Sequence, residues 1–141
     1  MLLTILTALG TLAACTAARW YLDRSSRRET EYAHGRVRLL TLWNGGGGFG
    51  LTLPMKTLIG ASFAALLATL AQFRRNRLGA GLLLGGGVSN LLERLRTGRV
   101  YDYVQFPRAP GKIKQFVFNL ADFAILLGGG LMMYARRRHR K

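Results

Sequence analysis

The sequence predicts an all-α membrane protein with four transmembrane helices, and three observations lead to this fold class. Half of the 141 residues are apolar, and the mean hydropathy is positive at +0.15. Four stretches of nearly membrane-spanning length carry almost no charged residues. The basic residues, 21 Lys and Arg against 6 Asp and Glu, gather between these stretches and at the C-terminus. The length fits one domain, placed at residues 1–141.

The four charge-poor stretches are the expected spans, at residues 2–22, 51–73, 78–95 and 116–135. Each approaches the ~20 residues that cross ~30 Å of hydrocarbon, and the third needs residues 93–95 to reach the membrane surface. Loops at residues 23–50 and 96–115 follow the first and third spans. The Arg-rich residues 74–77 leave room only for a tight turn between the second and third spans.

Basic residues predict the orientation of the four spans. The tight turn carries three Arg in four residues, and the tail at residues 136–141 is almost entirely basic. Both lie on the same side of a four-span bundle, and the side with the higher density of Lys and Arg is usually cytoplasmic. We therefore expect a multi-pass protein with cytoplasmic N- and C-termini and with both long loops outside.

Glycine runs indicate where helices approach closely. Gly85–Gly87 in the third span and Gly128–Gly130 in the fourth remove side chains between helices, as is common in membrane helix packing. Gly45–Gly48 lies outside any span and favours a tight extended segment or turn at the membrane surface. A phosphate-binding loop is excluded there, because no Gly-Lys-Ser/Thr follows.

The six carboxylates divide into two groups of three. Asp23, Glu29 and Glu31 lie in or beside the first loop among Arg residues, where solvated ion pairs are expected. The others lie at or within membrane depth: Glu93, Asp102 and Asp122. An ionisable group at that depth is energetically costly, so each of these three is a functional candidate.

Asp102 and Asp122 are expected to meet. Asp122 falls about six residues into the fourth span, roughly 9 Å below its start, and Asn119 shares its helix face. Asp102 lies in an alternating apolar and polar stretch directly after the third span. If the third and fourth spans are neighbours, this stretch returns over the outer end of the fourth.

Two carboxyls in a dry site cannot both ionise, so they share one proton, and the pair can both activate water and protonate a carbonyl oxygen. Such a dyad needs no metal or other cofactor. Asn90 and Arg94, four residues apart on the third span, can hold either carboxylate. Simpler interpretations stay open: a helix cap for Asp122, a loop carboxylate for Asp102, and a side chain that reaches the membrane surface for Arg94.

Four motifs resemble those of a known family. Residues 85–103, GGGVSNLLERLRTGRVYDY, resemble the Gly-Gly…Gly-Asn-x-x-Asp-Arg…Val-x-Asp-Phe box of signal peptidase II, the lipoprotein signal peptidase family. Residues 118–122, FNLAD, resemble its Phe-Asn-x-Ala-Asp box. LDRSSR at 22–27 and NGGGGFG at 44–50 are similar to its Leu-Asp-Gln-x-x-Lys and Asn-x-Gly-Ala-Ala-Phe-Gly motifs. The four motifs occur in the family's order, and together with the four spans placed between them they cover nearly the whole chain.

The resemblance implies an aspartic endopeptidase of the bacterial cytoplasmic membrane that removes signal peptides from diacylglyceryl-modified prolipoproteins. Asp102 and Asp122 would be catalytic. Matched supporting positions are Asp23, Asn44, Gly46, Asn90, Arg94, Asn119 and Ala121. The first outer loop would form a small extracytoplasmic β-cradle, and the second would form a helix or a loop on the membrane surface. The expected partners are lipid-modified prolipoproteins and membrane phospholipids, with the chain acting as a monomer and its site facing the extracytoplasmic side.

The chain departs from the family pattern at several positions. Glu93 replaces the Asp of the Asn-x-x-Asp-Arg box and so lengthens a supporting side chain by one methylene. Smaller exchanges occur at Arg24, Gly47, Gly48, Ser89, Tyr101 and Tyr103. No catalytic carboxylate is lost, and the pattern indicates a divergent member.

Two alternatives stay open. A catalytically silent paralogue or scaffold of the same fold would keep both Asp residues without turnover. A small proton-linked transporter also uses buried Asp residues, but it usually contains internal repeats, which this sequence lacks. Nucleic-acid binding, which the charge alone suggests, is excluded because the Arg clusters lie at span ends with no soluble module to present them.

Overall fold

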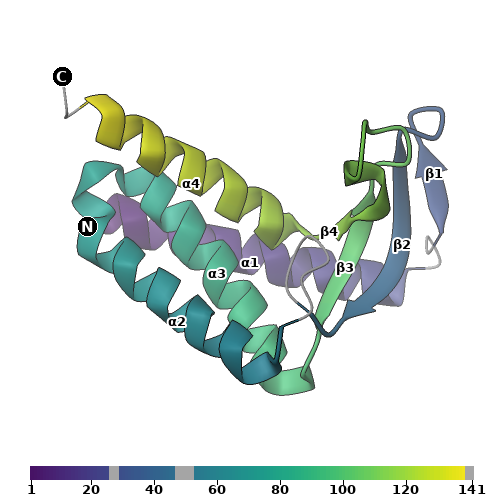
Figure 1. The fold of residues 1–141 in the computed structure, drawn as a ribbon, viewed down its shortest axis with the longest axis horizontal. Coiled ribbons are helices and arrows are strands. Elements are labelled where there is room, and N and C mark those ends of the chain that lie inside the picture. The colour runs from purple at the N-terminus through teal and green to yellow at the C-terminus, as the bar shows by residue number, and fades with distance from the viewer. Residues whose placement is uncertain (26–28, 47–52, 139–141) are drawn as a thin grey trace.

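A computed structural model describes residues 1–25, 29–46 and 53–138. This part of the chain contains four α-helices: α1 Leu2–Arg24, α2 Met55–Gln72, α3 Arg77–Thr97 and α4 Leu120–Arg138. Two short 3-10 helices are η2, Phe73–Arg75, and η3, Ile113–Gln115. The helices form a bundle with a small sheet at one end, and Met1 and the C-terminal end of α4 lie at the other (Figure 1).

Several sequence predictions lie outside the described residues. They are those on Ser26 and Arg27, on the loop from Gly47 to Gly50, on the first residues of the second span, and on the last three residues of the basic tail.

α3 is the central helix, packed against α1, α2 and α4. Its glycines allow this approach. A Cβ on Gly85 would lie 2.5 Å from the carbonyl oxygen of Ala8 in α1. A Cβ on Gly86 would lie 2.7 Å from the carbonyl oxygen of Ala121 in α4. Backbone therefore approaches backbone at both places, and the predicted close packing around these glycines is confirmed.

The prediction for the second glycine run is only partly correct. A Cβ on Gly128 would lie 2.6 Å from the carbonyl oxygen of Gly79, so this glycine does permit close contact between α4 and α3. A Cβ on Gly129 or Gly130 would meet nothing within 4 Å. Successive residues of a helix point about 100° apart, so only one of the three faces the neighbour.

The connection between α2 and α3 is tight, as predicted. η2 leads directly to Asn76, the N-cap of α3. The Oδ1 of Asn76 accepts a hydrogen bond from the backbone N–H of Gly79 at 2.8 Å. This side chain satisfies one of the donors that a helix start leaves without an intrahelical partner.

Two segments, Leu2–Arg24 and Met55–Arg75, are long and apolar enough to cross a membrane by length and composition. α3 and α4 are of similar length, 21 and 19 residues. Their glycine triplets and their Arg residues near the C-terminal ends make them less apolar. Membrane crossing by these two helices therefore stays a prediction.

The first long loop forms two strands, in keeping with the expected cradle, and the second long loop adds two more strands to the same sheet, which was not expected. Its strands are β1 Thr30–Tyr32, β2 Val37–Asn44, β3 Val100–Gln105 and β4 Val117–Phe118. They pair antiparallel in the order β1-β2-β3-β4. β3 contains the alternating stretch around Asp102, a period typical of strands. Because Leu42 pairs with Asp102 and Asn44 with Val100, the end of β2 lies beside Asp102.

The surface helix expected in the second loop is not present among residues 98–119, all of which the structure describes. The only helical segment there is the single 3-10 turn η3. Pro107, Pro110 and Gly111 interrupt this loop, and Gly111 has a positive φ of 62°. These residues disfavour a continuous α-helix.

α4 begins four residues later than the span predicted at 116. Val117 and Phe118 are extended and pair with β3, and the helix begins at Leu120, directly after Asn119. Asp122 therefore lies in the first turn of α4, not six residues into a span, which corrects the predicted depth. Asn119 precedes the helix, so the expectation that the two side chains share a helix face was also wrong.

Candidate aspartate site

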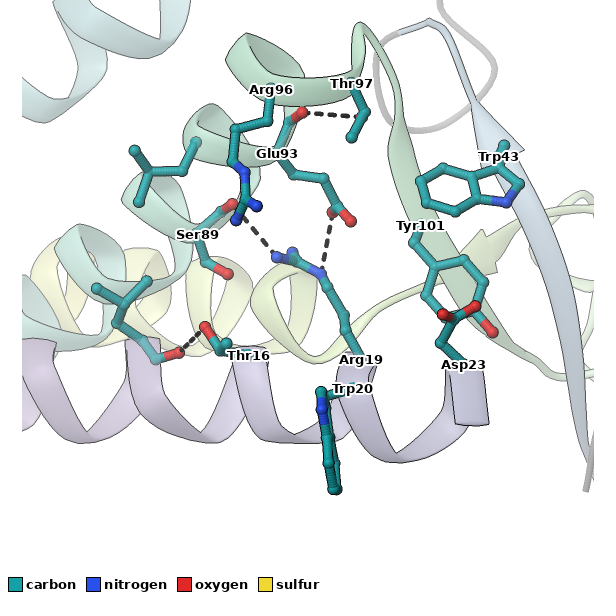
Figure 2. Close-up of a pocket in the computed structure, with 12 residues that line it drawn as sticks. Thr16, Arg19, Trp20, Asp23, Trp43, Ser89, Glu93, Arg96, Thr97 and Tyr101 are labelled. Atoms are coloured by element: carbon teal, nitrogen blue, oxygen red, sulfur yellow. Dashed lines mark hydrogen bonds and ion pairs between the residues drawn. The ribbon is translucent and has the colours of Figure 1, made fainter. Parts of the chain in front are cut away.

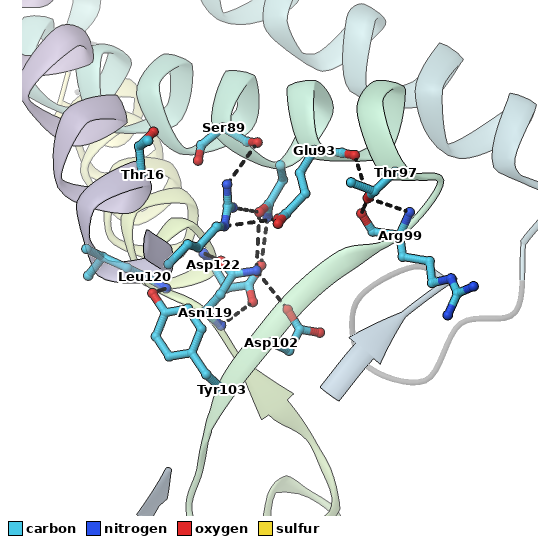
Figure 3. Close-up of polar contacts among 12 residues, drawn as sticks. Thr16, Ser89, Glu93, Thr97, Arg99, Asp102, Tyr103, Asn119, Leu120 and Asp122 are labelled. Carbon is cyan, nitrogen blue, oxygen red and sulfur yellow. Dashed lines mark hydrogen bonds and ion pairs between the residues drawn. The ribbon is translucent and has the colours of Figure 1, made fainter. Parts of the chain in front are cut away.

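The two predicted aspartates line one small cavity, of about 30 Å³, where β3 passes the start of α4. Asp102 comes from β3 and Asp122 from α4 (Figure 3). Asn90 and Arg94 come from α3. Asn44, at the end of β2, also lines the cavity. A polar cavity of this volume has room for a water molecule.

Asn119 connects the two aspartates. Its side chain is 1% exposed, and its Nδ2 donates to Asp102 Oδ1 at 2.8 Å. Its Oδ1 accepts from the backbone N–H of Asp122 at 3.1 Å, and its own N–H donates to Asp122 Oδ2 at 2.9 Å. This reciprocal pair is a capping box, in which the side chains of the N-cap and N3 residues satisfy each other's backbone donors. One asparagine therefore fixes both carboxylates.

Asn44 and Asn90 complete the set of donors. Asn44 Nδ2 donates to Asp102 Oδ2 at 3.1 Å, and Asn90 Nδ2 donates to Asp122 Oδ1 at 3.0 Å. The N–H of Gly46 donates to Asn44 Oδ1 at 2.9 Å and so orients the Asn44 amide. All four carboxyl oxygens thus have an N–H donor, as buried polar groups generally require.

Burial raises the pKa of Asp102 to about 6 from an ordinary value of 3.8, because its carboxyl is only 4% exposed. The charge of Asp122 adds to this rise. The amides of Asn44 and Asn119 and the charge of Arg94 oppose it. A carboxyl with this pKa holds a proton at weakly acidic pH and releases it near neutrality.

Arg94 brings positive charge to the wall of the cavity. Its charge acts on both Asp102 and Asp122. Its Nε is buried and has no hydrogen-bond partner in the part of the chain that the structure describes. A fixed cation with a free donor can stabilise negative charge that develops in a site with little water.

Six of the seven supporting positions lie at or near this cavity. Asn44, Gly46, Asn90, Arg94 and Asn119 are described above. Ala121 is fully buried beside Asp122, and its carbonyl oxygen faces Gly86. The seventh, Asp23, lines a different cavity.

That second cavity, of about 440 Å³, lies between α1, α3 and the strands β2 and β3 (Figure 2). Asp23 and the aromatic side chains of Trp20, Trp43 and Tyr101 line it. Neither Asp102 nor Asp122 does. Its volume is within the range of small-molecule pockets.

Two residues of the site region were missed by the sequence analysis. Tyr103 accepts a hydrogen bond from the backbone N–H of Leu120 at 2.9 Å, which ties β3 to the first turn of α4. Burial raises the pKa of its hydroxyl to about 12, so the group stays neutral. Arg19 pairs with Glu93 at 3.0 Å. The sequence could have indicated Arg19 as a functional candidate, because it is the only charged residue between residues 2 and 22, within a predicted span.

The described residues contain no group of three or more His, Cys, Asp or Glu side chains that could hold a metal ion. Apolar helices of membrane-spanning length, a sheet at one end of the bundle and an aspartate pair that lines one cavity define a membrane protein with a paired-carboxylate site.

Comparisons with known proteins agree with this class. Residues 6–137 match the family model described as Signal peptidase (SPase) II. The chain belongs to the signal peptidase II family, which confirms the resemblance seen in its motifs.

Two relatives named lipoprotein signal peptidase illustrate the match. The Desulfitobacterium hafniense protein is 41% identical over 99 residues, covering 64% of this chain and 62% of the relative. The Nitrobacter hamburgensis protein is 35% identical over 108 residues, covering 68% and 66%. Both matches thus span less than two thirds of the relative's length.

Solved structures show the same fold. One described as a bacterial membrane enzyme has a TM-score of 0.82 at 19% identity, covering 98% of this chain and 89% of the other. A second with the same description has a TM-score of 0.76, covering 94% and 90%.

Proposed function

We propose that the protein is an intramembrane aspartic endopeptidase that removes signal peptides from diacylglyceryl-modified prolipoproteins. The observation that carries this proposal is the pair Asp102 and Asp122, which lines one buried cavity with an N–H donor on every carboxyl oxygen. Membership of the signal peptidase II family supports the reaction, and the relatives named lipoprotein signal peptidase support the substrate class.

In the proposed mechanism the two carboxyls share one proton. The ionised carboxylate removes a proton from a water molecule as the water oxygen attacks the carbonyl carbon of the scissile bond. The protonated carboxyl donates its proton to the carbonyl oxygen. The tetrahedral intermediate then collapses: the leaving nitrogen takes a proton from the protonated carboxyl, the C–N bond breaks, and a hydroxyl of the intermediate returns its proton to the ionised carboxylate, so the pair again holds one proton. The proton belongs to the pair and not to one residue, because strongly interacting groups titrate together.

The surrounding residues have distinct roles in this mechanism. Asn119 holds the two carboxyls at a fixed separation, and Asn44 and Asn90 orient their outer oxygens. Arg94 offsets negative charge on the pair. No cofactor takes part in any of these steps.

We place the site on the extracytoplasmic side of the bacterial cytoplasmic membrane, with both termini in the cytoplasm. Met1 and the C-terminal end of α4 lie at the end of the bundle away from the sheet, which supports this arrangement (Figure 1). The substrate approaches laterally. Its acyl chains stay among the membrane phospholipids while the peptide bond before the modified Cys reaches the cavity. We propose that the chain acts as a monomer.

A direct test uses purified protein in lipid bicelles with a prolipoprotein that carries a diacylglyceryl-modified Cys. We expect cleavage before that Cys, and no cleavage of the same precursor without the lipid. Mass spectrometry of both products locates the cut. An intact modified precursor would show instead a catalytically silent member of the family.

The rate should depend on pH through Asp102. Because its pKa is about 6, kcat/KM is expected to fall as pH rises above this value and the pair loses its shared proton, by up to about tenfold per pH unit. Asn44→Ala removes a donor that stabilises the ionised form, so its falling limb should lie at higher pH.

The matched control for this shift is Gln105→Ala, on the strand that carries Asp102. The side-chain amide of Gln105 donates to the exposed carbonyl of Lys114 and not to a carboxyl. Its profile should coincide with that of the unsubstituted protein. A profile that is flat between pH 5 and 8, or a limb that Asn44→Ala does not move, contradicts the role of the shared proton.

A further inference from the structure

A mostly buried ion pair lies beside the aspartate site, on the wall of the larger cavity (Figure 2). Arg19 of α1 and Glu93 of α3 are 15% and 11% exposed in their side chains, and Arg19 Nε lies 3.0 Å from Glu93 Oε2. Removing two charges from water costs several kcal/mol per ion, and a hydrophobic pair of similar size is often as stable. Packing and stability alone therefore do not explain why two charged side chains occupy this position.

The other end of the Arg19 guanidinium reaches the site. Its Nη2 donates to Asn90 Oδ1 at 2.9 Å, and its Nη1 lies 3.4 Å from the carbonyl oxygen of Ser89. On the far side of the same amide, Asn90 Nδ2 donates to Asp122 Oδ1 at 3.0 Å. A continuous chain of contacts therefore runs from Glu93 through Arg19 and Asn90 to Asp122.

This series of contacts determines the orientation of the Asn90 amide. With the observed orientation, Oδ1 accepts from Arg19 and from Asn119 Nδ2 at 3.2 Å. A flipped amide would turn its NH₂ group toward these two donors and its oxygen toward the Asp122 carboxylate. The bond from Arg19 is the shorter and is charge-assisted, whereas Asn119 divides its Nδ2 between Asn90 and Asp102.

We propose that Arg19, held in place by Glu93, is a positioning residue that fixes the Asn90 amide with its NH₂ group toward Asp122. This role rests on the proposed peptidase function and extends it to a residue of α1 outside the cavity that holds the aspartates. The guanidinium suits the task, because its planar fork can donate to a carboxylate and to an amide oxygen at once. Glu93 fixes the fork and balances its charge.

The test replaces both partners, in the variant Arg19→Met/Glu93→Met. Two unbranched apolar side chains of similar length leave no buried charge unpaired, so the melting temperature should stay within about 5 °C of the original. We expect kcat to fall by at least about tenfold, the effect of losing one hydrogen bond to a charged group. KM should change by less than about twofold, because Arg19 does not line the aspartate cavity. A folded double variant with unchanged kcat overturns the proposal.

A second variant covers the case in which the double variant does not fold. Arg19→Lys keeps the charge opposite Glu93 but lacks the fork, so kcat should again fall with KM nearly unchanged. Unchanged kcat in this variant also overturns the proposal. The matched control is Arg24→Met, at the C-terminal end of α1, where the guanidinium lies 4.4 Å from the Trp20 ring centroid. This control should cleave at the original rate.

A third experiment makes the substitutions at Arg19 and Glu93 in the Asn90→Ala variant. It shows whether Arg19 affects kcat by way of Asn90. Glu93 also takes a hydrogen bond from the backbone of Tyr101, next to Asp102, which offers a different route. If Arg19 acts through Asn90, the substitutions at Arg19 and Glu93 should lower kcat no further in that background. An undiminished fall there overturns the proposal.

A readout without catalysis separates this role from the peptidase function. In ¹⁵N-labelled protein, the side-chain NH₂ signals of Asn90 are identified by their loss in Asn90→Ala. We expect slow hydrogen exchange of these signals in the original protein and fast exchange in Arg19→Met/Glu93→Met. If the protein cleaves no prolipoprotein but shows this change, the peptidase proposal fails and the positioning role stands. Equal exchange in both proteins refutes the positioning role.

Discussion

Asp102→Asn and Asp122→Asn are each expected to lower cleavage of a diacylglyceryl-modified prolipoprotein by roughly a hundredfold to ten-thousandfold. An amide neither removes a proton from water nor donates one as a carboxylic acid does, so either single change ends proton sharing. The measurement is kcat/KM with purified variants. Cleavage at the original rate by either variant contradicts the dyad.

The fold of these variants should survive. In Asp102→Asn the new NH₂ group faces an N–H donor from Asn44 or Asn119, which leaves a buried donor unpaired at a cost of about 1–3 kcal/mol. Burial disfavours the ionised form of Asp102, so replacing its carboxylate with a neutral amide offsets part of this cost. Melting temperatures therefore separate a lost reaction from a lost fold.

A carboxylate elsewhere provides the control. Glu31 pairs with Arg38 at 2.6 Å on the sheet, and its side chain is 51% exposed. Exposed pairs of this kind contribute little to stability. Glu31→Gln should change neither the melting temperature nor the cleavage rate.

Gly86→Ala is expected to produce the second large effect, on stability and activity together. The added Cβ would lie 2.7 Å from the carbonyl oxygen of Ala121 and 3.1 Å from Ile125 Cγ1, so α3 and α4 must separate. Overpacking of this kind costs about 1–3 kcal/mol. Because Ala121 precedes Asp122, the same movement displaces a carboxyl, and kcat should fall as well. Thermal unfolding and the cleavage assay measure the two effects.

Gly129→Ala is the matched control, since it makes the same change in α4. Its Cβ would meet nothing within 4 Å, and the higher helix propensity of Ala should leave stability unchanged or raise it by up to about 1 kcal/mol. Equal destabilisation by Gly86→Ala and Gly129→Ala would show that helix approach is not the cause.

The helices were predictable because charge-free stretches and the Arg-rich turn are local features of the sequence. The meeting of Asp102 and Asp122 was also predictable, since it follows from the third and fourth helices being neighbours. The start of α4 was not. Hydropathy assigns the apolar residues Val117 and Phe118 to a span, whereas their pairing with β3 makes them a strand.

The other features that the sequence did not predict depend on contacts between residues that are distant in the sequence. β2 pairs with β3 across the whole of α2 and α3, so no local pattern shows that one sheet uses both loops. The pairing of Arg19 with Glu93 is equally distant. Its two members were visible as charges near or within spans, but the sequence does not show that they meet beside Asn90.

The capping box at the start of α4 has a consequence for engineering. Because Asn119 holds both carboxyls, their separation is set by the dimensions of one side chain and not by the packing of a whole bundle. The unit that a designer would transplant is therefore short. It consists of a strand that presents one Asp and a helix that begins with Asn-x-x-Asp beside it.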